Sequence, residues 1–316
     1  MGKEHCLDES LVYYAWDNAV APRLTIDPGD TVIFDTRDAV DHYYNVDSTH
    51  IDVEKKGPLV GHPLTGPVFI REAEPGDTLV VEVINVVPSL GFGWTAIRPG
   101  KGLLPQNEFP NCFLQIWDLS QGDLAHMKQR DDIAIPIHAF PGIMGTALDD
   151  AGEHSTIPPR RNGGNMDIKH LTSGTTLYLP VLVEGGLFST GDAHAAQGDG
   201  EVCVTAIEMS AMVTLKFDLQ KGNCIPEPQF RTSEQSCMHT SNSPCFVTTA
   251  HGPDLYECSQ RAIRYMIEYI VNERGLSREE AYILCSVCVD LKINEIVDAP
   301  NWIISAFLPE SVFIDK

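Results

Sequence analysis

The sequence predicts a mainly β fold, a sandwich or barrel of sheets with a smaller α+β element toward the C-terminal end. Three segments place a glycine turn directly before β-branched and aromatic residues, at positions 27–34, 74–83 and 172–179. Glycine permits the backbone conformations of tight turns, and β-branched and aromatic residues favour strands. Helical periodicity is scarce before about residue 210, so sheets packed on one another are the predicted architecture.

The later elements follow from local patterns. Alternation of apolar and polar residues predicts strands at 79–83 and 202–207. Apolar residues at positions 255, 262, 263, 266, 267 and 270 form one helical face, which predicts a helix over 255–272 that stops near Gly275. A capping box at residues 277–280 predicts a second helix. Residues 290–296 and 302–308 are predicted as strands.

Two stretches rich in proline and glycine, 158–164 and 222–253, interrupt these elements. The second stretch suggests a division into two regions. Residues 1–221 would form a β-rich domain, and residues 222–316 an α+β region with two helices packed against it.

Composition excludes several classes of function. The chain has 316 residues, 43% hydrophobic residues and a formal net charge of -22, which opposes binding to nucleic acids and anionic membranes. It has no run of about 18 apolar residues and no basic, then apolar, N-terminal leader, so we expect a cytoplasmic protein. Nine cysteines without a regular framework predict free thiols. Cys285 and Cys288 have zinc or redox spacing, but they lie in an apolar run typical of buried thiols.

The most informative segment is residues 191–201, which combines carboxylates, an imidazole, an amide and three glycines between strand-like runs. Asp192 and His194 are two residues apart, so an extended backbone points both side chains to the same face, where they could share a divalent cation. A turn at Gly198 and Gly200 would bring Glu201 back toward that face. The alternative interpretation is an acidic surface turn.

Residues 162–167, 177–181 and 185–202 together resemble the central signature of the acetamidase/formamidase family. The resemblance continues upstream at 36–39, 66–70 and 74–79, and downstream at 290–293 and 300–302. One departure follows Met144 and Gly145, where a short Ala-Pro element of the family is replaced by residues 146–150, Thr-Ala-Leu-Asp-Asp.

The resemblance implies a jelly-roll-like β fold with a smaller α+β element, and hydrolysis of a small neutral amide such as formamide or acetamide. Larger amides, including arylacetamides, are an alternative substrate class, and a non-catalytic β-sandwich that binds a metal or small molecule is a second alternative. Phe92, Trp94 and Phe140 are candidates for an apolar substrate pocket. We expect a homodimer.

Amide hydrolysis without an identifiable serine or cysteine nucleophile favours water activated by a divalent metal ion. We predict Asp192 and His194 as ligands, with Asp38 added from its match to the family's Thr-x-Asp-Ala segment; the alternative for Asp38 is a turn aspartate. The imidazole favours zinc, and the abundant carboxylates keep calcium as an alternative. His42, His50 and His62 are further residues that could approach the metal.

The remaining site residues are assigned by chemistry. Glu201 is the predicted general base, with a structural carboxylate as the alternative. Asn165 and Gln197 are neutral amides suited to bind the substrate amide, or to tie loops together. Asp167 would orient His194, as the partners of histidine ligands usually do.

Overall fold

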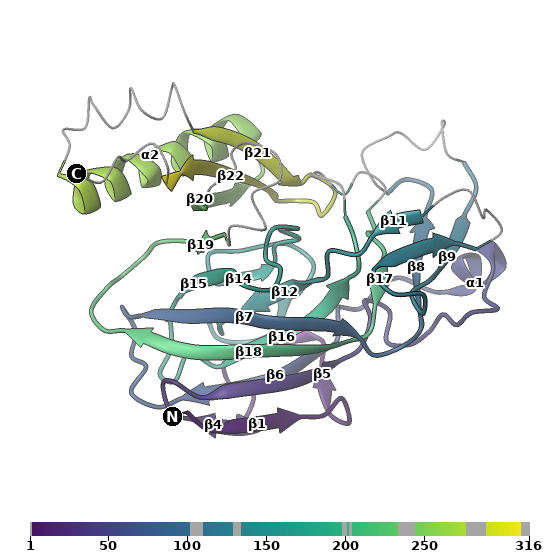
Figure 1. Cartoon of the computed structure of the whole chain (residues 1–316), viewed down its shortest axis with the longest axis horizontal. Helices are drawn as coiled ribbons and strands as arrows, with labels where there is room; N and C mark the ends of the chain where they lie inside the picture. Colours follow the sequence, from purple (N-terminus) through teal and green to yellow (C-terminus); the bar gives the residue numbers. More distant parts are fainter. Residues whose placement is uncertain are drawn as a thin grey trace.

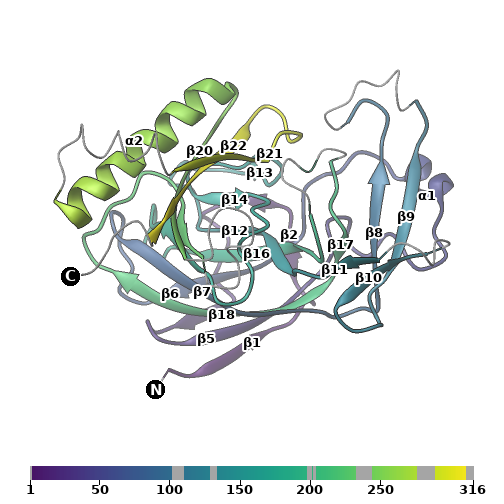
Figure 2. The ribbon, with the colours of Figure 1, turned by 45° about the horizontal axis from the view of Figure 1, so that its top comes forward.

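Two β-sheets make up most of the computed structural model, which describes residues 2–101, 110–128, 134–197, 201, 204–232, 244–275 and 289–310 (Figures 1 and 2). Within these residues the first sheet has nine strands, in the order β1 (Glu4–Leu7), β5 (Thr31–Thr36), β18 (Ala211–Gln220), β7 (Thr78–Pro88), β15 (Thr176–Pro180), β19 (Gln229–Arg231), β20 (Cys245–Gly252), β22 (Trp302–Pro309) and β21 (Asp290–Glu295).

The second sheet has eleven strands. Its main path is β11 (Ala134–Pro136), β10 (Leu124–Met127), β9 (Phe113–Asp118), β8 (Phe92–Ile97), β17 (Glu208–Met209), β16 (Phe188–His194), β12 (Phe140–Gly145) and β14 (Gly163–Asn165). Beside β16 lies β6 (Leu64–Ile70), which also pairs with β2 (Val12–Tyr13) and β4 (Leu24–Ile26). A separate ladder joins β3 (Ala15–Trp16) to β13 (His154–Ser155). The mainly β prediction is confirmed, while the jelly-roll detail stays a prediction.

The main core lies between the two sheets. Phe34 and Phe217 of the nine-stranded sheet contact Phe188 of the eleven-stranded sheet edge to face, with ring centroids 5.8 Å and 4.9 Å from it. Burial alternates along β5 in the period of two expected for a strand with one core-facing side. The buried face of each sheet therefore covers that of the other.

Two helices are described, α1 (His50–Lys55) and α2 (Leu255–Arg274). The longer one, α2, begins at Asp254, whose carboxylate accepts the backbone N–H groups of Tyr256 and Glu257, and ends at Gly275 with a left-handed φ of 68°. Its apolar face packs on β20 and β22, and Figure 1 shows the helix lying beside these strands. Neither described helix is long and apolar enough to cross a membrane.

The strands predicted after the three glycine turns are present as β5, β7 and β15, and the predicted elements near the C-terminal end are present as α2, β21 and β22. The strand predicted over 202–207 is wrong for residues 204–207, because the hydroxyl of Thr205 bonds to both backbone polar groups of Ala96 in place of a ladder. Residues 202 and 203, the second predicted helix and the pair Cys285 and Cys288 lie outside the described residues.

The stretch 222–253 was expected to be irregular, but it contains β19 and β20. Leu177 of β15 pairs with Phe230 of β19, so the nine-stranded sheet runs across the division predicted at residue 221. The C-terminal strands therefore extend a sheet that the first region begins.

Candidate active site

The candidate site forms where β16 meets the short strand β17. Asp192 and His194 project from β16 and are 3% and 1% exposed. The distance between Asp192 Oδ1 and His194 Nε2 is 3.5 Å, so the structure brings together the two residues that the sequence pattern paired.

Glu208 completes this group, and the sequence analysis missed it. It lies directly opposite His194 in the antiparallel pairing of β16 with β17, and its Oε2 atom is 3.2 Å from His194 Nε2. Opposite residues in such a pair have Cβ atoms about 5 Å apart, which explains the contact. One feature of the sequence could have indicated Glu208: it is a carboxylate between the apolar residues Ile207 and Met209. Strand pairing places this segment beside β16.

Three atoms of this group are buried without a hydrogen-bond partner among the described residues: Asp192 Oδ1, His194 Nε2 and Glu208 Oε2. Buried polar atoms are almost always paired, so an unpaired set whose atoms face one another needs an explanation. A cation between them would provide it. In the part of the chain that the structure describes, these three residues form one of two groups with suitable spacing for a metal ion.

The side-chain amide of Gln197 fixes the other ring nitrogen of His194, Nδ1. The Nδ1 atom is 3.0 Å from Gln197 Oε1, and Gln197 Nε2 donates to the backbone carbonyl of Asp167 at 2.8 Å. The carboxylate of Asp167 lies 3.8 Å from the same nitrogen. Gln197, predicted to bind substrate, thus has both ends of its amide engaged within the protein and orients His194.

Glu201 and Asp167 form the second spaced group with His194. Asp167, Asp192 and Glu201 all have left-handed backbones, with φ values of 47°, 51° and 46°. Such conformations cost about 1–3 kcal/mol each in non-glycine residues and concentrate at functional sites. The glycine turn at 198–200 that was expected to return Glu201 lies outside the described residues, but Glu201 itself is at the site.

His62, one of three histidines considered from the sequence, approaches the group. Its Nε2 atom is 3.8 Å from Asp192 Oδ2, and its side chain is buried. His42 instead bonds to Ser210 Oγ at 2.8 Å, and His50 begins α1.

Asp38 belongs to neither spaced group. Its Oδ1 atom accepts the backbone N–H groups of Val40 and His42, and its Oδ2 atom accepts the indole N–H of Trp94 at 3.3 Å. These contacts match the turn aspartate that was the alternative interpretation. Glu208, and not Asp38, is grouped with Asp192 and His194 in the described part of the chain.

A cavity of about 490 Å³ opens onto the site. Its polar lining includes Asn165, Asp167, Asp192, Glu201, Glu208 and Asp298. Its apolar lining includes Val40, Leu59, Trp94, Ile157, Ile296 and Trp302. Trp94 is therefore at the pocket, as expected from the sequence, whereas Phe140 packs its ring edge to face on His194.

The pKa values of the titratable groups in the site are shifted in different directions. Burial opposes the charged form of His194, but Glu208 and Asp192 raise its pKa well above the ordinary value. Burial would raise the pKa of Asp192, yet His62 and His194 hold it below the ordinary value. Burial raises the pKa of Glu208 to about 7, and burial together with Asp167 raises that of Glu201 well above the ordinary range. Burial and neighbouring charges thus shift the pKa of Asp192 in the opposite direction to those of Glu201 and Glu208.

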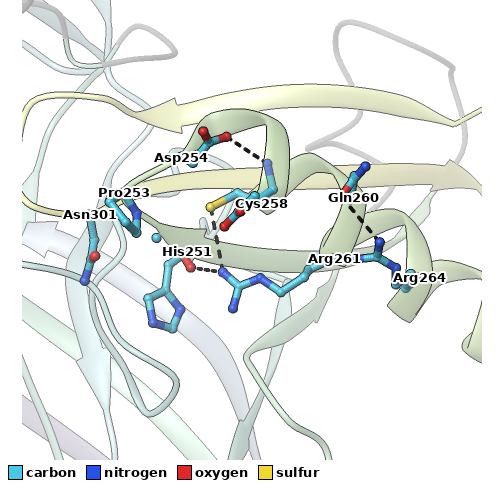
Figure 3. A pocket seen from close by; sticks show the side chains of 10 residues that line it. His251, Pro253, Asp254, Cys258, Gln260, Arg261, Arg264 and Asn301 are labelled. Atoms are coloured by element: carbon cyan, nitrogen blue, oxygen red, sulfur yellow. Dashed lines mark hydrogen bonds between the residues drawn. The ribbon is translucent and has the colours of Figure 1, made fainter.

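A second cavity, of about 500 Å³, lies beside the start of α2 (Figure 3). Its central guanidinium, Arg261, bonds to the His251 carbonyl, to Cys258 Sγ at 3.7 Å and to Glu227 Oε1 at 3.1 Å. These contacts pair the Arg261 guanidinium with groups of the protein itself. We therefore take the first cavity as the candidate active site.

Comparisons with known proteins show the family of the chain. The sequence profile of the acetamidase/formamidase family matches residues 2–151 and 148–315. The chain is 26% identical to a formamidase of Methylophilus methylotrophus, with 96% of this chain and 90% of that protein aligned. It is 29% identical to an acetamidase of Mycolicibacterium smegmatis, with 66% and 65% aligned.

Solved structures show the same similarity. An acetamidase from Bacillus halodurans superposes with a TM-score of 0.87 at 29% identity, over 98% of both chains. An acetamidase from Yersinia enterocolitica superposes with a TM-score of 0.86 at 26% identity, over 99% of this chain and 93% of that one. The similarity therefore extends through both sheets.

Proposed function

Because the chain belongs to the acetamidase/formamidase family and is an amidohydrolase, we propose that it hydrolyses a formamide- or acetamide-type substrate to a carboxylate and ammonia, with the help of a divalent metal ion. We also keep as proposals the cytoplasmic location and the homodimer expected from the sequence.

The observation that carries the metal proposal is the set of three unpaired buried atoms on Asp192, His194 and Glu208. Zinc ligands at about 2.0–2.2 Å in a tetrahedral arrangement lie about 3.3–3.6 Å from one another. The distances from His194 Nε2 to the two carboxylate oxygens, 3.5 Å and 3.2 Å, fit that spacing. His62 is a fourth candidate, and burial lowers its pKa toward the neutral form that binds metals.

A set of carboxylate and imidazole ligands favours zinc, with calcium as the alternative. When bound, the ion would polarise the amide carbonyl and lower the pKa of a coordinated water from about 15.7 toward about 7.

The protein's own groups would supply the remaining steps. Glu201 is the proposed base that takes a proton from the attacking water, because its raised pKa makes its carboxylate a stronger base. Asn165 presents a buried Oδ1 atom without a hydrogen-bond partner at the cavity, suited to accept an N–H of the substrate amide.

A second candidate substrate class is supported by the cavity itself. Acetamide has four heavy atoms and would replace only a few waters of about 30 Å³ each, whereas the cavity holds about 490 Å³ and has tryptophan, leucine and isoleucine side chains in its wall. An arylacetamide would fill more of this apolar surface.

The test is to measure bound metal and ammonia release together in matched glutamate variants. We expect Glu208→Gln to bind zinc at least tenfold more weakly and to lose turnover, and Glu201→Gln to keep its metal while kcat falls at least a hundredfold. Glu184→Gln is the control, because Glu184 is exposed and is not part of the cavity lining. Full metal content and activity in Glu208→Gln would contradict the proposed ligand set.

Substrates for the assay are formamide, acetamide, a longer aliphatic amide and an arylacetamide, each with and without chelator and zinc. Loss of ammonia release on chelation and its return with zinc are expected. Turnover that survives complete removal of metal would contradict metal dependence while leaving amide hydrolysis intact.

A further inference from the structure

Asp298 is a cavity-lining carboxyl that the assignments above leave without a role. It lies in the turn between β21 and β22 of the nine-stranded sheet, whereas the proposed ligands come from the eleven-stranded sheet. The cavity is thus lined by groups from both sheets, and Asp298 is the carboxyl that the C-terminal turn contributes.

The turn holds Asp298 in a fixed position. Glu295 Oε1 accepts the backbone N–H groups of Val297 and Asp298, the latter at 2.6 Å. The Asp298 carbonyl accepts the backbone N–H of Asn301 at 3.3 Å. These bonds fix the backbone of the turn from which the Asp298 side chain projects.

One oxygen of the Asp298 carboxyl is already engaged. Asn165 Nδ2 donates to Asp298 Oδ2 at 2.7 Å. Since an amide N–H needs an acceptor, a protonated Asp298 would carry its proton on the other oxygen, Oδ1.

The surroundings favour that protonated form. Burial raises the pKa of Asp298 well above its ordinary value, and the nearby carboxylates of Glu295 and Asp192 act in the same direction. The bond from Asn165 opposes them without reversing the shift. A neutral carboxyl beside a proposed amide-hydrolysing centre has the form that a proton donor requires.

The other carboxyls of the cavity wall have assigned places. Asp192 and Glu208 belong to the proposed metal group, Glu201 is the proposed base, and Asp167 is 1% exposed against the Nδ1 side of His194. Asp298 is half-buried and presents its side chain to the cavity.

We propose that Asp298 is the general acid that protonates the leaving nitrogen, an inference that rests on the proposed amide hydrolysis. The attacking water bonds to the carbonyl carbon and gives one proton to Glu201. The C–N bond breaks, its electron pair stays on nitrogen, and nitrogen takes the proton from Asp298 Oδ1. Return of the proton from Glu201 to Asp298 restores both residues and leaves one carboxylic acid and one ammonia for each amide and water consumed.

The test exploits the leaving group. A primary amide needs a proton on nitrogen as the bond breaks, whereas a p-nitrophenyl ester of the same acyl group releases a stable phenolate without one. In Asp298→Asn we expect kcat for the amide to fall at least a hundredfold and kcat for the ester to change less than threefold. Glu184→Gln should match the wild type on both substrates.

Equal losses on amide and ester, or no loss on either, would overturn the general-acid role. Metal content and circular dichroism of Asp298→Asn establish that the variant is folded. Should the variant not fold, a series of substituted anilides tests proton donation in the wild type. Rates nearly independent of the basicity of the anilide leaving group support proton donation. A steep fall of the rate with basicity overturns it. Failure of the proposed function would be recognised separately, as a metal-loaded wild type that releases no ammonia from any amide.

Discussion

Gly142 shows how little space the site leaves at the level of single residues. A Cβ atom at this position would lie 2.6 Å from Asp167 Oδ1, 2.7 Å from the Asp192 carbonyl oxygen and 3.0 Å from His194 Cε1. One of these neighbours is backbone, so the strand itself would have to shift. Glycine is therefore required where β12 passes the side chains of Asp167 and His194 and the backbone of Asp192.

We expect Gly142→Ala to lower amide turnover at least tenfold and to destabilise the fold by about 1–3 kcal/mol through overpacking. Steady-state kinetics and urea unfolding measure the two effects. The control is Gly57→Ala, because a Cβ there meets nothing within 4 Å. Wild-type kinetics in Gly142→Ala would show that the site tolerates a displaced strand.

At this scale the sequence predicted that Asp192 and His194 lie together, as the structure shows. Asp192 and His194 were found because a spacing of two along one strand is visible in the sequence. Glu208 was missed because its proximity depends on cross-strand register, which one sequence does not display. Asp38 was predicted as a ligand from a motif match, whereas the structure shows its carboxylate accepting backbone N–H groups and the indole N–H of Trp94.

Among the elements, the turn before β5 depends on one carboxylate. Asp30, 3% exposed, accepts the backbone N–H groups of Lys3 and Asp27 and contacts His5 Nε2 at 3.0 Å, so it ties β1 to the turn. Burial opposes its ionised form, but these bonds lower the pKa of Asp30 to about 2.

A folded-state pKa below the unfolded value of 3.8 means that ionised Asp30 stabilises the fold above that pH, and that this stability is lost as pH falls toward 2. We expect Asp30→Asn to cost about 2 kcal/mol at pH 7 and roughly half as much at pH 3. Urea unfolding at the two pH values measures the difference. A cost that does not change with pH would assign the effect to lost hydrogen bonds alone.

Strands that follow a glycine turn were predicted correctly, because the preferences of glycine for turns and of β-branched residues for strands depend on the local sequence. The strands β19 and β20 were missed, because a stretch rich in proline and glycine conceals them. Their pairing partners, β15 and β22, are about 50 residues away in opposite directions along the chain, so local composition carries little information about them.

For the whole molecule, the continuity of the nine-stranded sheet matters most. Phe230 of β19 is fully buried, pairs with Leu177 of β15 and packs edge to face on Phe307 of β22, with ring centroids 5.6 Å apart. This single side chain therefore contacts strands on both sides of residue 221. Interactions of this kind couple the unfolding of the two regions.

We expect one unfolding transition. In a Trp302→Phe background, loss of the circular dichroism signal of helix α2 should coincide with the fluorescence change of Trp16, Trp94 and Trp117, which all lie in the first region. Phe230→Ala should lower the free energy of unfolding by about 3–5 kcal/mol and shift both signals together. Phe113→Ala is the matched control, because Phe113 is 52% exposed and the same truncation there opens no cavity. Separation of the two signals, or a shift of the helical signal alone, would mean that residues 222–316 fold independently. The position of Asp298 at the cavity would then depend on the docking of two units instead of on one continuous sheet.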